Sequence, residues 1–232
     1  KETEHQAELI KLPSRELGFW ELIHTYYDFY RLDLSQFDLV ISSKYPSWMV
    51  PHKNGICYML HTLRGFYDTY HLTKLPLTVD RKNHKISQIL DYMEKNADFK
   101  KLDQFFQLLF ELEGRRDIPE SYFQFPGAFI RSVIHFLDAC ALSQEGMKHI
   151  YAISETVKSR SSYYPAGADV KVIYPPTVLK KRRSGEWKHL FVASRLDAPK
   201  RIDLLIRAMK YVQGDIPLYI AGSGPQKVEW EK

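Results

Sequence analysis

The chain has 232 residues, a length that suits one large domain or two small ones. Hydrophobic residues make up 44% and charged residues 26%, which is an ordinary globular composition that excludes a disordered chain. The net charge of +5 is compatible with phosphate-bearing ligands, anionic lipid head groups or nucleic acid, and it does not distinguish these ligand classes. The two cysteines, Cys57 and Cys140, give neither a disulfide framework nor a metal-ligand spacing, which indicates a reducing, cytoplasmic setting. No apolar stretch approaches the roughly 18 residues of a membrane span.

The N-terminal part begins with helical periodicity and continues into strands. Within residues 1–36 a helix is predicted from the spacing of Leu17, Trp20, Ile23, Tyr26 and Tyr27. The short apolar runs 37–43 and 56–60 predict two buried parallel strands, and His61 stands at the carboxyl end of the second.

A long helical stretch, about 64–145, separates these strands from the next pair. It contains amphipathic patterns at 84–96, 99–112 and 127–142, and it predicts an insertion or lid within the first domain. Its scattered charges are typical of a solvated face.

Strands are predicted again at 149–153 and 170–174, and Ser154 is a good N-cap for a helix after the first of them. Residues 175–187 are rich in Pro, Lys and Arg and predict a linker between domains. The basic run 180–183 within it is too short for a nucleic-acid-binding arm.

The second domain is predicted to follow as strand 187–193, a helix at about 200–212 and strand 218–221. The chain is therefore α/β with parallel sheets, divided into a first domain at 1–174 and the start of a second at 188–232. A single βαβ unit cannot cover both faces of a parallel sheet, so the second domain is expected to be incomplete.

The loop after strand 187–193 carries Arg195 and Lys200 and leads into a helix N-terminus. In open α/β sheets ligands bind beyond the carboxyl ends of the strands, and a guanidinium, an ammonium and free helix N–H groups together suit a diphosphate. A loop of solvated basic residues is the alternative. The turn Gly222-Ser223-Gly224 after the next strand would let the backbone approach a nucleotide closely, although such a turn is often only structural.

His61 is a candidate catalytic residue, because at a strand end it can bind a sugar hydroxyl or tune a reacting oxygen; a structural histidine is the alternative. The remaining histidines show no ligand spacing, so no metal is assigned. Paired carboxylates, a nucleophile elbow and a Walker loop are absent from the sequence.

Six segments, taken in order, resemble the family 4 retaining glycosyltransferases, especially their mannosyltransferase-like branch. The two most specific are 193–203, which is similar to the family pattern xGRLxxxKRxD, and 220–225, which is similar to IxGxGP. The other four are the strands 37–43 and 56–62, the helix start 152–157 and the segment 172–176.

The resemblance implies a GT-B fold, in which two Rossmann-like domains face a cleft and the C-terminal one holds the nucleotide sugar. It implies that Arg195 and Lys200 bind the diphosphate of a UDP- or GDP-linked donor, that Gly222, Ser223 and Gly224 lie near the nucleotide, and that His61 lies near the transferred sugar. Transfer would proceed with retention and without an obligatory metal or other cofactor. The implied acceptors are lipid-linked or polysaccharide intermediates, with a membrane surface as a further partner, at the cytoplasmic side of the inner membrane.

The chain departs from the family pattern in several places. Leu63 stands where Pro is usual and Ser194 where Gly is usual, and the chain contains neither the N-terminal Gly-rich loop nor the C-terminal Glu-x7-Glu region. A glycosyltransferase, either a fragment of one or a divergent relative, is therefore expected, and a non-catalytic binding module of the same fold, holding a phosphate-bearing ligand or a protein partner, is the alternative. Nucleic acid is not expected as a partner, since no nucleic-acid-binding module is recognisable. The sugar, the nucleotide, the acceptor and the oligomeric state are not specified by these patterns.

Overall fold

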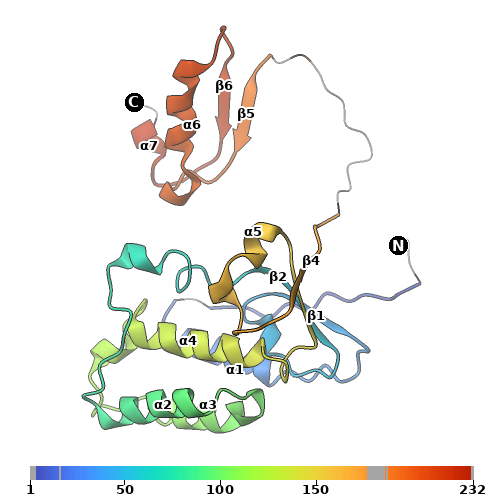
Figure 1. The fold of residues 1–232 in the computed structure, drawn as a ribbon. Coiled ribbons are helices and arrows are strands. Elements are labelled where there is room, and N and C mark those ends of the chain that lie inside the picture. Colours follow the sequence, from blue (N-terminus) through green and yellow to red (C-terminus); the bar gives the residue numbers. More distant parts are fainter. Residues whose placement is uncertain (1–3, 16, 177–185, 187, 231–232) are drawn as a thin grey trace. The chain divides into compact units, whose positions relative to one another are not determined.

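The computed structural model describes residues 4–15, 17–176, 186 and 188–230. It divides into two compact units, Lys1–Pro176 and Thr177–Lys232 (Figure 1). The boundary falls within the predicted linker 175–187. Most of that linker, including its basic run 180–183, lies outside the described residues.

Unit 1 contains a four-stranded sheet in the order β1-β2-β3-β4, and every neighbouring pair is parallel. The chain is thus α/β with a parallel sheet, as predicted. Since the strands run the same way, their carboxyl ends lie at one edge. The strands are β1 Val40–Lys44, β2 Gly55–His61, β3 His149–Ala152 and β4 Val170–Val172.

One face of the unit 1 sheet lies in the main core, and the other face is only partly buried among the described residues. Cys57 and Met59 on β2 are buried in the main core, whereas the alternate residue Tyr58 is only partly buried, and Ile41 on β1 is exposed. The strands predicted to be buried are therefore buried in the core on one face and partly exposed on the other. A short continuous apolar run shows that a strand is apolar, but the elements that cover each face decide its burial.

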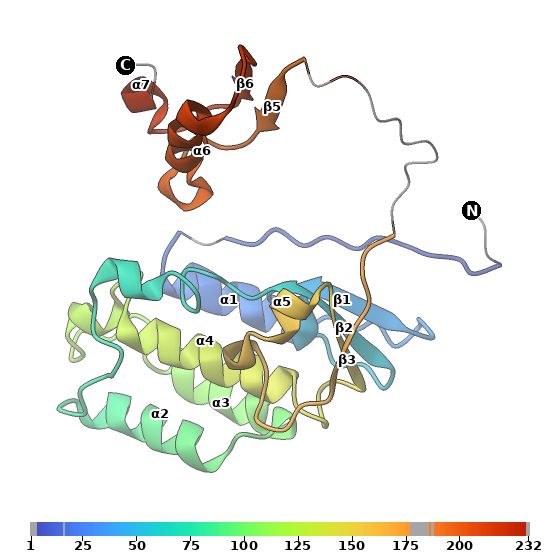
Figure 2. The same ribbon diagram turned by 45° about the horizontal axis from the view of Figure 1, so that its top comes forward.

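The helices of unit 1 are α1 Phe19–Tyr30, α2 His84–Lys95, α3 Leu102–Phe110, α4 Ala128–Ala141 and the short α5 Glu155–Lys158. Figures 1 and 2 show α4 between the sheet and a layer in which α2 and α3 lie side by side. All of these helices contribute side chains to one continuous core with the sheet. The stretch predicted as an insertion or lid is therefore an integral layer of unit 1. Among the described residues, no helix is both long and apolar enough to cross a bilayer.

Local sequence signals explain where several helices begin. Asn83 caps α2, because its side-chain oxygen accepts hydrogen bonds from the first backbone N–H groups of the helix. Ser154 caps α5 as predicted, with its hydroxyl 3.2 Å from the backbone nitrogen of Val157. The prediction for Leu17 was wrong: α1 begins at Phe19 after the extended Gly18, and Leu17 is 86% exposed.

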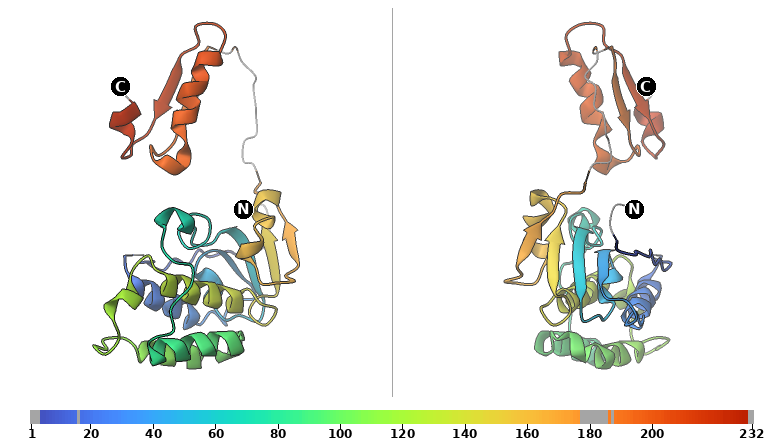
Figure 3. Two further views of the ribbon diagram at one scale, coloured as in Figure 1. Left: turned by 60° about the vertical axis from the view of Figure 1, so that its left-hand side comes forward. Right: turned by 90° about the vertical axis from the view of Figure 1, so that its right-hand side faces the viewer.

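Unit 2 consists of β5 Leu190–Ala193, α6 Ile202–Ala208, β6 Leu218–Ala221 and α7 Lys227–Trp230, with β5 and β6 parallel and in direct register (Figure 3). The helix predicted from about 200 begins at Ile202, because Arg201 adopts a left-handed conformation with φ of 50° and separates α6 from a preceding 3₁₀ turn. The helix also ends at Ala208, where a second 3₁₀ turn takes over. Phe191 and Tyr219 remain exposed on the pair of strands.

Candidate functional site

His61 ends β2 at the carboxyl edge of the unit 1 sheet. Its Nδ1 lies 2.7 Å from the carbonyl oxygen of Thr62. A carbonyl oxygen only accepts hydrogen bonds, so this contact assigns the proton of the neutral ring to Nδ1 and leaves Nε2 with a lone pair. The ring is partly exposed and lies 5.9 Å from the ring of Tyr45. His61 is therefore arranged to accept a hydrogen bond from a ligand hydroxyl.

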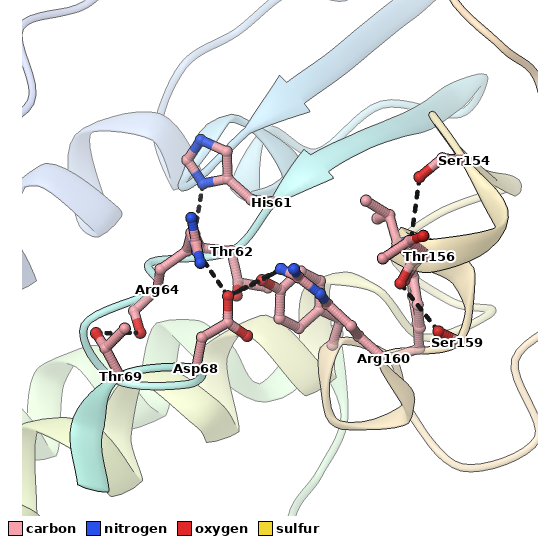
Figure 4. Close-up of polar contacts among 12 residues, drawn as sticks. His61, Thr62, Arg64, Asp68, Thr69, Ser154, Thr156, Ser159 and Arg160 are labelled. Carbon is pink, nitrogen blue, oxygen red and sulfur yellow. Dashed lines mark hydrogen bonds and ion pairs between the residues drawn. The ribbon is translucent and has the colours of Figure 1, made fainter. Parts of the chain in front are cut away.

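One carboxylate oxygen in the loop after β2 accepts three hydrogen bonds. Asp68 Oδ2 lies 2.7 Å from Arg64 Nε, 2.8 Å from Arg160 Nη1 and 2.8 Å from the hydroxyl of Tyr163 (Figure 4). The Tyr163 hydroxyl in turn accepts from Arg160 Nη1 at 2.6 Å. Burial and the nearby carboxylate raise the pKa of Tyr163, so its hydroxyl keeps its proton. We call these four residues the Asp68 cluster.

The sequence patterns did not predict the Asp68 cluster. Asp68 and Arg160 are 92 positions apart, and neither belongs to a motif. Only the parallel arrangement of β2 and β3 brings the segments that follow them to one edge. No signal within either segment predicts the contact.

A buried carboxylate lies at the centre of unit 1. Asp138 on α4 is 1% exposed. Its Oδ1 accepts from Trp48 Nε1 at 2.8 Å and from the Tyr26 hydroxyl at 3.0 Å, and its Oδ2 accepts from the Tyr67 hydroxyl at 2.8 Å. We call these four residues the Asp138 hub. Burial raises the pKa of Asp138 to about 6, although the three hydrogen bonds act in the opposite direction.

The Asp138 hub contacts the Asp68 cluster through aromatic rings. The ring of Tyr67 lies 5.6 Å from that of Tyr163 and stacks on His135 at 3.9 Å. Burial lowers the pKa of His135 to about 4, so this ring is neutral near pH 7. A sequence pattern indicates that Asp138 is buried: it lies on the apolar face of its helix, one turn after Ile134 and one turn before Ala141.

In unit 2, Arg195 and Lys200 lie on the loop after β5, as predicted from the sequence. The side chain of Arg195 is 75% exposed and lies 3.3 Å from a carboxylate oxygen of Asp197. Lys200 is exposed at the end of the 3₁₀ turn Ala198–Lys200. The predicted helix N-terminus does not follow directly, because left-handed Arg201 stands between this turn and α6.

The glycines after β6 lie against the protein backbone of the preceding loop. A Cβ atom on Gly222 would lie 1.8 Å from the carbonyl oxygen of Ser194, and one on Gly224 would lie 2.2 Å from that of Leu196. The backbone nitrogen of Leu196 also donates to the carbonyl oxygen of Ser223 at 2.8 Å. These glycines thus let the two loops approach each other, which is a structural reason for them whatever their relation to a ligand.

Two side-chain acceptors in these loops are buried and lack hydrogen-bond donors among the described residues: Asp197 Oδ1 and Gln226 Oε1. Gln226 is fixed next to the first loop, because its backbone nitrogen donates to the carbonyl oxygen of Leu196 at 3.1 Å. Unpaired buried acceptors are costly, and since both atoms are fully covered in this structure, a ligand could donate to them only after the loops move.

Within the part of the chain that the structure describes, no group of three or more His, Cys, Asp or Glu side chains is arranged to hold a metal ion. Comparison of the chain with protein-family models, with curated proteins and with solved structures found no match. The residues and their geometry therefore carry the functional argument.

Replacing Gly222 or Gly224 by Ala is expected to destabilise unit 2 by about 1–3 kcal/mol, because the added methyl group would overlap a backbone carbonyl oxygen and the backbone would have to shift. Thermal and urea unfolding of each variant would measure the loss. Gly65→Ala is the matched control, since a Cβ there meets nothing within 4 Å and the residue has no positive φ. Wild-type stability in the Gly222 and Gly224 variants would contradict the close approach of the loops.

Asp138 gives a pH dependence with a definite sign. Its folded pKa of about 6 lies above its ordinary value of 3.8, so folding takes up a proton between these values. The stability from this group is fully present below about pH 4 and is lost as the pH rises through about 6. The free energy of unfolding of the wild type relative to Asp138→Asn should fall by about 3 kcal/mol from about pH 4 to about pH 7, as measured by urea unfolding.

His135 provides a control of opposite sign. Its pKa is lowered to about 4 from 6.5, so the unfolded chain binds the extra proton. The stability of the wild type relative to His135→Gln should therefore rise over the same pH range. Parallel pH profiles for the Asp138 variant and the wild type would show that Asp138 does not titrate as described.

Proposed function

We propose that this chain is a retaining glycosyltransferase of the GT-B type, whole or in part, and that unit 2 holds the diphosphate of a nucleotide-sugar donor. One observation carries the proposal. Arg195 and Lys200 project from the loop after β5, and that loop is hydrogen-bonded to the glycine turn after β6, at the carboxyl edge of a parallel strand pair. Ligands of open α/β sheets bind at such an edge.

The charges of this loop suit a diphosphate. Arg195 is paired with one carboxylate but remains largely exposed, and Lys200 has no ion pair among the described residues. A diphosphate can take bidentate hydrogen bonds from the guanidinium and a point charge from the ammonium. The same cations would stabilise the charge that develops on a departing nucleoside diphosphate.

The unpaired acceptors of the two loops support a sugar-bearing ligand. Asp197 Oδ1 and Gln226 Oε1 lack donors in this structure, and ribose and hexose hydroxyl groups would supply them if ligand binding opened the two loops. A bare phosphate would not, because at neutral pH it is mainly an acceptor. The donor is accordingly proposed to be a UDP- or GDP-linked sugar.

Unit 1 is proposed to serve the acceptor, a lipid-linked or polysaccharide intermediate, at the cytoplasmic face of the inner membrane. His61 is the proposed catalytic residue of this unit, because Nε2 of its ring is left as a hydrogen-bond acceptor at the carboxyl edge of the sheet. The proposed reaction needs no metal or other cofactor.

Thermal unfolding with UDP, GDP, their sugar conjugates and ADP tests the donor site. A ligand at a hundred times its dissociation constant adds about 2.7 kcal/mol, which is a midpoint shift of roughly 5–10 °C at this size. We expect this shift with one nucleotide in the wild type and its loss in Arg195→Ala/Lys200→Ala. The double variant Arg207→Ala/Lys210→Ala removes the same charge from exposed positions farther along unit 2 and should keep the shift. Equal nucleotide binding by both double variants would refute the assignment.

His61→Ala tests the catalytic assignment separately. The variant should bind the nucleotide as the wild type does, while release of nucleoside diphosphate from the sugar conjugate should slow by roughly 100-fold or more. The readout is nucleoside diphosphate formed over time with saturating donor. Unchanged turnover would remove His61 from the chemistry. Nucleotide binding without any turnover in the wild type would instead favour the non-catalytic binding module.

A further inference from the structure

The carboxyl edge of the unit 1 sheet carries an excess of positive charge. Lys44 ends β1, Arg64 follows β2, and Arg160 follows β3 and α5. Asp68 is the acidic residue paired with these arginines. The exposed Glu155 and Lys158 of α5 offset each other, so the edge keeps two uncompensated positive charges from the side chains named.

The two arginines of the Asp68 cluster have unused hydrogen-bond donors. Arg64 contacts Asp68 through Nε, and Arg160 contacts Asp68 and Tyr163 through Nη1. Their other guanidinium nitrogens have no acceptor among the described residues. The side chains of Arg64 and Arg160 are 50% and 33% exposed, whereas that of Asp68 is 19% exposed. The free donors are therefore accessible, while the carboxylate is largely covered.

The arrangement holds both arginines in place before any ligand arrives. Figure 4 shows Arg64 and Arg160 directed toward Asp68 from opposite sides. The guanidinium of Arg160 also lies 5.3 Å from the centre of the buried Tyr163 ring. The backbone of Arg64 is fixed by Thr69, whose nitrogen and hydroxyl lie 3.0 Å and 3.2 Å from its carbonyl oxygen. Fixed donors bind an anion at a smaller cost in side-chain entropy.

A purely structural role explains this cluster poorly. One guanidinium is enough to neutralise Asp68, and a second one on the same oxygen adds repulsion between the cations. A phosphate group would relieve that repulsion and accept bidentate hydrogen bonds from planar guanidinium groups. The Asp68 cluster lies beyond the carboxyl ends of parallel strands, which is where open α/β sheets bind ligands.

We propose that Arg64 and Arg160 form a phosphate-binding site in unit 1, with Asp68 as the residue that positions them. The ligand is a phosphate monoester or diester, carried either by a soluble molecule or by a lipid head group. If the chain is a glycosyltransferase, this phosphate belongs to the acceptor. The site is made of residues other than Arg195 and Lys200, so its test does not depend on the donor proposal.

Phosphate binding is tested in the full chain with Arg195→Ala/Lys200→Ala as the background, which removes the proposed site of unit 2. Inorganic phosphate is titrated against chloride at equal ionic strength, and the midpoint of thermal unfolding is followed. We expect a phosphate-dependent rise, with affinity weakened about tenfold or more by Arg64→Gln or Arg160→Gln. Arg81→Gln is the matched control, because Arg81 is paired with both Asp91 and Glu94 and has no surplus charge.

Asp68→Asn keeps the test decisive if an arginine variant fails to fold. It retains both guanidinium groups and an amide oxygen that still accepts their positioning hydrogen bonds, and it removes only the competing negative charge, so phosphate affinity should be equal to or higher than in the background chain. Weaker phosphate binding in Asp68→Asn than in the background, or equal binding in the arginine variants and Arg81→Gln, would overturn the proposal. Absence of any phosphate-dependent shift in the background chain would also overturn it.

Vesicles distinguish the two sources of the phosphate. Co-sedimentation is measured with phosphatidylcholine vesicles, with and without phosphatidylglycerol, for the background chain and for Arg64→Gln and Arg160→Gln. Binding to the anionic vesicles that both arginine variants lose, but Arg81→Gln keeps, supports a lipid head group. Phosphate binding without vesicle binding supports a soluble ligand. Vesicle binding that is unchanged in the arginine variants excludes the lipid source.

Discussion

Unit 1 is organised around a carboxylate that is buried without a cationic partner. Asp138 is held by three neutral donors, from α1, from the 3₁₀ turn Ser47–Met49 and from the loop after β2. Each donor would itself be unsatisfied without it, so removing any one leaves a buried polar group unpaired. The hub therefore fixes how α4 sits against three separate segments, and it does so more specifically than apolar contacts alone. Burying the charged carboxylate is unfavourable, and burial therefore raises the pKa of Asp138 to about 6.

The Asp138 hub also holds a loop at the surface of unit 1. Tyr67 belongs to the hub and lies in the loop that carries Arg64 and Asp68, while its ring contacts Tyr163 of the Asp68 cluster. The loop is thus anchored from below by a hydrogen bond to Asp138 and at its surface by the ion pairs of Asp68. In unit 2 the loops beyond the strands are held in place by different interactions. There the loops after β5 and β6 are held by backbone hydrogen bonds, which the absence of side chains at Gly222 and Gly224 permits.

Periodicity was enough to predict the parallel α/β architecture and most of the helices, because those depend on local patterns of apolar residues. Periodicity did not predict how deeply the strands are buried, where the helices begin and end, or which polar side chains form the Asp68 cluster. The strands were predicted to be buried, but one face of the sheet is partly exposed. The helix predicted to begin near residue 200 begins at Ile202 because Arg201 is left-handed. Arg195 and Lys200 could be assigned to one loop from their short separation. The Asp68 cluster could not be predicted, since its partners meet only through strand pairing across 92 positions.

The two basic sites differ in a way that fits different ligands. In unit 1 the arginines share a largely covered carboxylate and a buried tyrosine, so their donors are fixed and their charge is partly neutralised. Such a site recognises the geometry of a group that stays attached to its molecule. In unit 2 Arg195 is exposed with one carboxylate partner, and Lys200 has no ion pair among the described residues. These exposed cations match a diphosphate in charge, but stabilising a leaving group requires preorganised groups, so in the proposed reaction the bound donor itself would have to hold them in place.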